Sequence, residues 1–218
     1  MGFELGKKYQ LITVGGFTLT KQTKVVNGKN ETVAFFKESL NGDILRTSLN
    51  ITSDKDGKEI LFSCHQGDFV DAYGEKRCEL YAKTFRCRKP LLLKSTNGGE
   101  FHLRTDSIWQ VWIPITKKYV IEGRNGIEAT YCFSADKSRF ECEIAEKNSL
   151  PPEIILTLGA LLASMPLTVS DADDLSRVIG PEDDEDKKDA RFVARVSLSI
   201  GAIFLIAWVL KLLALLFD

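Results

Sequence analysis

The densest group of charged side chains in this sequence is a basic stretch between residues 76 and 94. Within it stand a single carboxylate, Glu79, and two interleaved aromatic residues, Tyr81 and Phe85. Each ammonium or guanidinium group close to an anionic membrane contributes about 1 kcal/mol of attraction. The stretch is therefore a candidate surface for lipid headgroups, and the alternative is an ordinary solvated strand pair with its hairpin. Its basic members are Lys76, Arg77, Lys83, Arg86, Arg88, Lys89 and Lys94.

Nucleic acid is a weaker candidate partner for these basic groups. Residues 1–150 carry 23 Lys and Arg against 19 Asp and Glu, a net charge of only +4, and they contain no nucleic-acid-binding motif. We therefore expect no nucleic-acid partner. Residues 170–190 carry 3 basic against 9 acidic residues, so an acidic segment follows the mildly basic body.

Two tryptophans, Trp109 and Trp112, form a second candidate contact region. They are three residues apart, so on a strand their side chains point to opposite faces. We expect one to pack in the core and the other to be at least partly exposed. The exposed one is a candidate contact for a protein partner.

The sequence offers little for catalysis. His65 and His102 are the only histidines, and both fall on expected strands. Cys64 precedes His65, but neighbours along a strand point to opposite faces, which disfavours a Cys–His dyad between them. No phosphate-binding, nucleophile-elbow or metalloprotease motif occurs. We predict no enzymatic activity, no catalytic residue, no metal and no cofactor.

The five cysteines are an odd number and form no CxxC pair. A secreted disulfide framework usually has an even count, and a zinc site usually has paired ligands. The first thirty residues also contain no apolar stretch of signal-peptide length. We therefore expect reduced thiols in a cytosolic domain. They are Cys64, Cys78, Cys87, Cys132 and Cys142.

The elements that would position these residues are mostly strands. Short runs rich in Val, Ile, Phe, Thr and Tyr extend from about residue 9 to 142, and Asn-Gly or Asp-Gly dipeptides separate them. Such dipeptides favour tight hairpins because both residues tolerate positive φ. We count about eleven or twelve candidate strands, too many for one open sheet of ordinary size. A closed barrel or a sandwich is expected. The dipeptides begin at Asn27, Asn41, Asp56, Asn97 and Asn125.

An apolar run at about residues 152–165 follows the strands. Pro152 suits the first turn of a helix, Glu153 lies near its positive end, and Pro166 ends it. The helix is apolar on every side, so we expect it to be buried all round. It is too short to span a bilayer comfortably. The simplest arrangement threads it through the barrel.

An antiparallel barrel of about twelve strands closed around a late hydrophobic helix resembles the tubby C-terminal-like fold. That group includes the tubby, LURP-one-related and phospholipid scramblase families. The resemblance covers about residues 10–166 and is carried by element order, the strand-(Asn/Asp)-Gly-strand pattern and the Pro-initiated helix. It implies association with membranes, often through acidic lipid headgroups, and no established hydrolytic chemistry. No calcium or phosphoinositide ligand of the family can be assigned to a residue of this sequence.

Residues 196–217 form a candidate membrane span. These 22 residues include one charge, Lys211, and as a helix they would extend roughly 33 Å, the thickness of a hydrocarbon core. Trp208 and Lys211 suit the far headgroup region. Basic residues just before the span, between 187 and 195, predict that the preceding domain faces the cytosol. The alternative is a core helix packed inside the barrel.

We therefore expect three parts: a β-barrel domain at 1–168, an acidic linker at 169–190 and a C-terminal membrane anchor at 191–218. The leading hypothesis is a single-pass, tail-anchored protein. Its cytosolic barrel would bind anionic lipid headgroups or a protein partner as a tether or adaptor. The alternatives are an interaction scaffold without a lipid role, and a barrel that carries a small apolar ligand. The acidic final residue, Asp218, favours the endoplasmic reticulum over the mitochondrial outer membrane.

Overall fold

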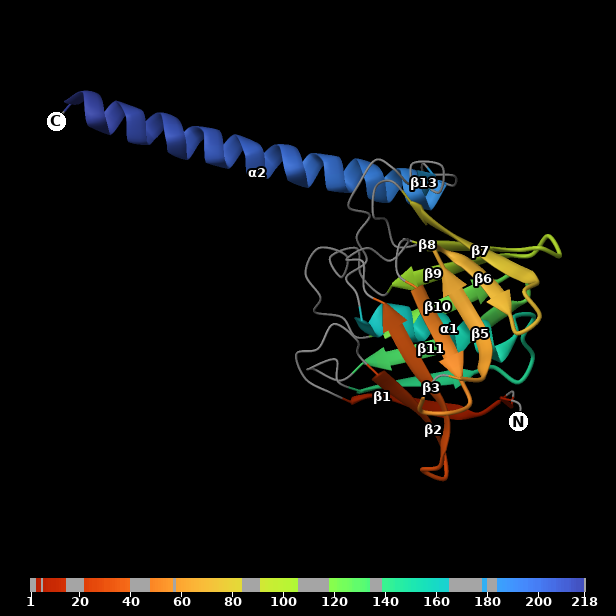
Figure 1. Cartoon of the computed structure of the whole chain (residues 1–218). Helices are drawn as coiled ribbons and strands as arrows, with labels where there is room; N and C mark the ends of the chain where they lie inside the picture. The colour runs from red at the N-terminus through yellow and green to blue at the C-terminus, as the bar shows by residue number, and fades with distance from the viewer. Residues whose placement is uncertain are drawn as a thin grey trace.

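The computed structural model of the 218-residue chain describes residues 3–4, 6–14, 22–39, 48–56, 58–83, 91–105, 118–133, 139–164, 178–179 and 184–217. Twelve antiparallel strands form a closed barrel (Figure 1). They follow one another in chain order around the wall: β7 pairs with both β6 and β8, and β12 pairs with β1. These pairings close the sheet. The predicted mainly-β closed barrel of about twelve strands is confirmed.

The strands are short, from four residues in β6 to eight in β7. They are β1 (Lys8–Val14), β2 (Gln22–Asn27), β3 (Thr32–Ser39), β4 (Ser48–Thr52), β5 (Ile60–His65), β6 (Asp68–Asp71), β7 (Lys76–Lys83), β8 (Leu91–Ser95), β9 (Glu100–Thr105), β10 (Lys118–Gly123), β11 (Gly126–Phe133) and β12 (Arg139–Ile144).

Alternation along strands such as β9 assigns side chains to the inside or the outside of the wall. In β9, for example, Phe101, Leu103 and Thr105 are buried, whereas Glu100 and Arg104 are exposed. This period of two is the one expected for a sheet with one buried face.

Glycines make the tight turns between strands possible. Gly74 has φ +84° and Gly98 has φ +82°, a left-handed conformation that residues with a Cβ seldom adopt.

The helix α1 (Pro152–Ser164) follows β12. It packs against β4, β5, β11 and β12, and its residues from Ile154 to Leu158 are fully buried. A Cβ atom added to Gly159 would lie 2.8 Å from the rings of both Phe140 and Tyr131. This glycine therefore allows a close approach between the helix and the wall.

The barrel has two distinct ends because neighbouring strands run in opposite directions. We call the end at which β7 finishes the β13 end, and the opposite end the turn end. The registers place the finishing residues of β1, β3, β5, β9 and β11 at the β13 end as well. Strands at the β13 end are joined by residues 15–21, 40–47, 66–67, 84–90, 106–117 and 134–138. At the turn end the connections are 28–31, 53–59, 72–75, 96–99 and 124–125, together with 145–151, which leads into α1.

A two-residue strand, β13 (Val178–Ile179), lies against the end of β7. It runs parallel to β7, with Val178 beside Ala82 and Ile179 beside Lys83. The edge of β7 is open there because β6 begins only at Asp68, opposite Glu79.

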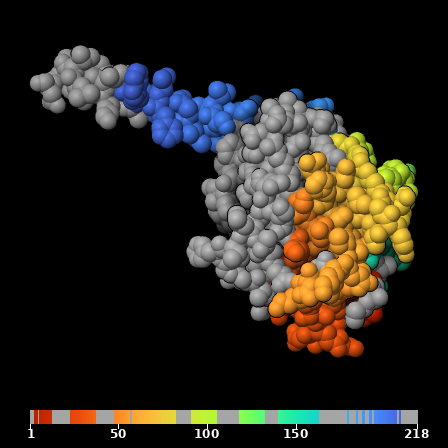
Figure 2. All heavy atoms as spheres, in the orientation of Figure 1, coloured from red at the N-terminus to blue at the C-terminus, as the bar shows by residue number. Residues whose placement is uncertain are grey.

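The long helix α2 (Asp184–Phe217) follows β13 and extends away from the barrel (Figures 1 and 2). It begins inside the predicted acidic linker, which therefore contains β13 and the first turns of the helix. Carboxylates at the start of α2 are favourable because that end of a helix carries positive partial charge.

Within the described part of the chain, no helix combines the length and the apolar character that crossing a membrane requires. The span at 196–217 stays a prediction. Side chains of α2 are described as far as Trp208, and several large apolar ones are exposed. They are Phe192, Leu198, Ile200, Ile203, Phe204, Leu205, Ile206 and Trp208.

Candidate functional site

The basic stretch lies on the hairpin formed by β7 and β8, and the barrel divides it into two groups. Lys76 and Arg77 begin β7 at the turn end. Lys94 belongs to β8 and lies beside Glu79 of β7. Lys83 finishes β7 at the β13 end. Seven residue steps separate Lys76 from Lys83, or roughly 23 Å along the strand. The stretch is therefore not one continuous patch.

The remaining basic candidates belong to the segment that leaves the β13 end. Arg86, Arg88 and Lys89 fall between Lys83 and the first residue of β8, Leu91, and lie outside the described residues. The side chain of Lys83 also lies outside them. We call Lys83, Arg86, Arg88 and Lys89 the β13-end group, and Lys76, Arg77 and Lys94 the turn-end group.

Two carboxylates, one on β6 and one on β7 itself, balance the charge of Lys76. Its ammonium lies 3.0 Å from Asp68 Oδ1 and also contacts Glu79. The hydrogen bond to Glu79 is the main cause that raises the pKa of Lys76, and the bond to Asp68 adds to it. Lys76 is thus paired within the wall of the barrel.

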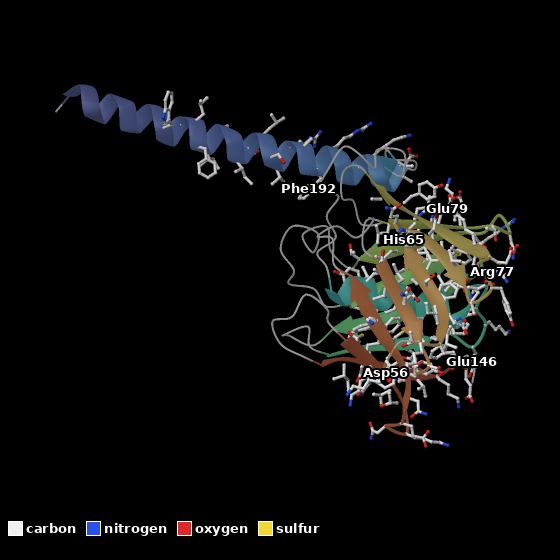
Figure 3. All side chains as sticks on the ribbon, in the orientation of Figure 1. Asp56, His65, Arg77, Glu79, Glu146 and Phe192 are labelled. Atoms are coloured by element: carbon white, nitrogen blue, oxygen red, sulfur yellow. The ribbon has the colours of Figure 1, made fainter. Side chains whose placement is uncertain are left out.

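Arg77 is held in the turn between β6 and β7. Its Nε donates to Asp71 Oδ2 at 2.7 Å. The other oxygen of Asp71 accepts the main-chain N–H groups of Tyr73 and Glu75, each at 2.9 Å. The guanidinium therefore helps to fix the turn, and Figure 3 shows Arg77 and Glu79 on the outside of the barrel.

Lys94 also has local partners. Its ammonium lies 3.3 Å from a carboxylate oxygen of Glu100 and 5.4 Å from the ring centre of Tyr81. All three members of the turn-end group are therefore matched with acidic side chains. Sequence reasoning missed this because Asp68, Asp71 and Glu100 come from outside the basic stretch, and only the strand register brings them beside it.

A second polar pair on the outer face was not predicted. Ser48 Oγ and His65 Nδ1 are 2.5 Å apart, because Ser48 of β4 is the register partner of His65 in β5. His65 is exposed and Cys64 fully buried, so these neighbours occupy opposite faces, as expected. A cross-strand hydrogen bond of this kind stabilises a sheet.

The described cysteines are free thiols. Cys64, Cys78 and Cys142 are buried and Cys132 is exposed, while Cys87 lies outside the described residues. Burial raises the pKa of the Cys78 thiol to about 11 and raises the pKa of Cys142 further. A protonated thiol is a poor nucleophile, which makes these two cysteines unreactive near neutral pH.

The two candidate contacts for a protein partner are not among the residues that the structure describes. Trp109 and Trp112 lie outside the described residues. In the described part of the chain, no cluster of three or more His, Cys, Asp and Glu side chains has the arrangement that a metal ion needs.

Comparison with known proteins found no family model and no curated protein that matches this chain.

Proposed function

We propose that this chain is a membrane-tethered barrel protein of the tubby-like kind that binds anionic lipid headgroups through its β13-end group. Helix α2 is its anchor, and α1 fills the inside of the barrel. The protein acts as a tether or adaptor and catalyses no reaction. The membrane is its main partner, with the barrel in the cytosol.

The pairing of β13 with β7 is the observation that carries this proposal. Ile179 lies beside Lys83, one inter-strand spacing of about 4.8 Å away. From Ile179, five residue steps lead to the start of α2 at Asp184, at most about 18 Å of extended chain. An anchor attached at this point keeps Lys83 and the neighbouring basic segment close to the headgroups. Weak individual contacts then suffice, because the tether supplies a high effective concentration.

The described side chains of α2 support a bilayer as its surroundings. Ile203, Phe204, Leu205 and Ile206 are consecutive and exposed. Successive residues of a helix point about 100° apart, so these four present apolar surface in every direction. Such a helix suits a lipid environment better than a single partner helix, which would cover one stripe.

The first half of α2 has a different character. Its exposed basic residues precede the apolar part and suit the headgroup region on the cytosolic side. They are Lys187, Lys188, Arg191 and Arg195.

A barrel that carries a small apolar ligand is less favoured. The buried side chains of α1 belong to the same core as those of the strands, so the helix takes up the space that a ligand would need. The second alternative is a protein scaffold without lipid binding, and the flotation experiment below distinguishes it from the proposed function.

Vesicle flotation of a chain that ends at residue 183 tests headgroup binding without the anchor. Every described residue of the buried core lies between Tyr9 and Leu162, so this truncation removes none of them. We expect the truncated chain to float with vesicles that contain phosphatidylserine or phosphoinositide and not with phosphatidylcholine alone. Binding should weaken as salt is raised, because salt screens charge attraction.

Two triple variants with equal loss of charge locate the surface. The test variant carries Arg86→Ser, Arg88→Ser and Lys89→Ser, and the control carries Lys76→Ser, Arg77→Ser and Lys94→Ser. Flotation should fall severalfold in the test variant and much less in the control, whose basic groups are already paired. Equal binding by all three proteins would remove the β13-end group from the proposal. No binding even by the unaltered barrel would favour a protein-binding module.

The anchor is tested separately with the full chain. Expressed in cells, it should stay in the membrane fraction after alkaline carbonate washing, whereas the chain that ends at residue 183 should be released. Release of both proteins would show that α2 does not anchor the chain.

A further inference from the structure

Part of the edge of β7 is not covered by β6. Strand β6 follows β5 through a two-residue turn, Gln66-Gly67, in which both φ angles are positive, +51° and +79°. The carbonyl of Gly67 accepts the N–H of Leu80 at 2.8 Å, and β6 reaches no further along β7. Ala82 presents its main-chain N–H and C=O to the same side as Leu80, because these groups alternate along a strand. A backbone edge of this kind accepts a further strand.

Strand β13 covers this open edge with only two residues. Val178 and Ile179 run parallel to the last two residues of β7. In the sequence, Gly180 and Pro181 follow at once, and a proline has no N–H to donate to a ladder. None of the described core residues belongs to β13. A pairing this short contains few main-chain hydrogen bonds, so it can open without disturbing the rest of the sheet.

This pairing determines how much chain lies between the barrel and α2. While it is made, five residue steps lead from Ile179 to the start of α2 at Asp184, at most about 18 Å of extended chain. Without it, the connection begins at Ser164, where α1 ends, and has twenty residue steps, at most about 70 Å. Loss of the pairing therefore lengthens the tether about fourfold.

The composition of this connection favours an extended chain once the pairing is lost. Residues 165–183 contain 5 acidic residues and 1 basic residue, a net charge of −4. Charged linkers repel themselves and extend. The longer connection would therefore use much of its reach.

We propose that β13 is a releasable strap that sets the distance between the barrel and the membrane. Paired with β7, it holds the β13 end within reach of the headgroups. Released, it lets the barrel move outward and meet partners farther from the bilayer. This inference rests on the proposed anchoring by α2. Headgroup contact and the pairing of β13 both need the barrel close to the membrane, so each favours the other.

Proline substitutions in the full chain test the strap. Val178→Pro together with Ile179→Pro removes both N–H groups of β13. The control, Ala172→Pro together with Leu175→Pro, places two prolines in the same connection but outside β13.

Energy transfer from a fluorophore to acceptor-labelled lipids measures how far the barrel lies from the bilayer. The fluorophore is attached to Cys132, which is exposed, in a Cys87→Ser background. The other three cysteines are buried and stay unlabelled. The proteins are reconstituted into vesicles of phosphatidylcholine alone, so that lipid charge does not hold the barrel down.

A reversible lock provides the closed state for comparison. Lys83→Cys and Ile179→Cys place two thiols on paired residues, about 4.8 Å apart across the strands, within the Cα separation that a disulfide bridges. This disulfide is formed before Cys132 is labelled, and later reduction opens it in the same molecules.

We expect the strongest transfer in the locked protein, less in the unaltered and control proteins, and severalfold less in the proline variant. Equal transfer by the proline variant and its control would show that β13 does not set the distance. Equal transfer by the locked and the reduced protein would show that the pairing never opens. Either result overturns the strap and leaves the anchor intact. If the unaltered chain fails to float with the vesicles, the proposed anchor is wrong and the strap falls with it.

Hydrogen exchange gives a local measurement that needs no membrane. The N–H of Ala82 should lose protection in the proline variant and keep it in the control. The N–H of Leu80, which is bonded to Gly67, should stay protected in both and shows that the barrel is folded. An unprotected Ala82 in the unaltered chain would mean that β13 does not hold the edge of β7.

Discussion

The hydroxyl of Tyr131 in β11 donates a 2.7 Å hydrogen bond to the main-chain carbonyl of Ile155 in α1. Both residues are fully buried. The ring of Tyr131 also lies 6.3 Å from that of Phe140, edge to face. This bond satisfies a buried hydroxyl and fixes the position of the helix along the wall. Burial raises the pKa of Tyr131 well above its ordinary value, so the hydroxyl remains a donor at all moderate pH.

Replacement of Tyr131 by Phe should destabilise the protein by about 1 kcal/mol, the usual net contribution of one hydrogen bond. The ring stays, so the core volume hardly changes. The urea midpoint of the chain that ends at residue 183 measures the effect. Tyr73→Phe is the control, because Tyr73 is 90% exposed. Equal midpoints for both variants would show that the hydroxyl of Tyr131 adds no stability.

Gly159→Ala should destabilise the barrel although alanine is the better helix former. Alanine gains about 1 kcal/mol of helix propensity. Its methyl group, however, would lie 2.8 Å from the rings of Phe140 and Tyr131, and overpacking of a core costs about 1–3 kcal/mol. We expect a lower melting temperature. Gly28→Ala serves as the control, since no atom lies within 4 Å of a Cβ there. A rise in melting temperature for Gly159→Ala would mean that α1 is loosely packed.

Glu128→Ala should destabilise the segment that connects β12 to α1. Glu128 is 1% exposed, and its Oε2 accepts the main-chain N–H of Ser149 at 2.5 Å. Alanine leaves this N–H without the acceptor, at a cost of about 1–3 kcal/mol. Glu128→Gln keeps an oxygen acceptor and should recover part of the loss. Hydrogen exchange at Ser149 gives a local measurement, and unchanged protection in Glu128→Ala would contradict the assignment.

Stability should fall between about pH 9 and pH 11. The pKa of Cys78 rises from 9.0 to about 11 in the folded protein because the thiol is buried. The unfolded chain therefore loses its proton first, and the folded state loses stability as pH increases through this window. Below pH 9 the thiol is protonated in both the folded and the unfolded state, so its contribution to the free energy of unfolding is complete there.

Urea unfolding at pH 8 and pH 10.5 tests this dependence. Cys78→Ala should weaken the fall in stability between the two values. Cys132→Ala is the control, because Cys132 is exposed. If the free energy of unfolding falls equally between pH 8 and pH 10.5 in the unaltered protein and in both variants, the Cys78 thiol does not control alkaline stability.

Much of the barrel could be predicted from local patterns. Alternation of apolar and polar residues marks a strand with one buried face, as in β9, and Asn97-Gly98 marks the hairpin that precedes it. These signals are local because strand period and turn conformation depend on neighbouring residues alone. The number of strands that these signals mark was enough to predict a closed sheet.

The carboxylates that pair with the basic residues could not be predicted from such local patterns. Lys76 pairs with Asp68 because β6 and β7 are adjacent and in a particular register. A register is set by the whole hairpin and its bulge, and a shift of one residue would move each side chain to the other face. The basic stretch therefore looked continuous in sequence, although three of its seven basic residues are paired with carboxylates of the barrel.

The position of β13 depends most on tertiary structure. Two residues, Val178 and Ile179, carry no pattern that distinguishes a strand from a linker. They pair with Ala82 and Lys83 because β6 is short and leaves that edge of β7 open. Composition and periodicity along the chain predicted the strands and the apolar C-terminal segment. The strand β13, which precedes that segment, meets one end of the barrel at an unpaired backbone edge, since exposed N–H and C=O groups accept whichever strand can reach them.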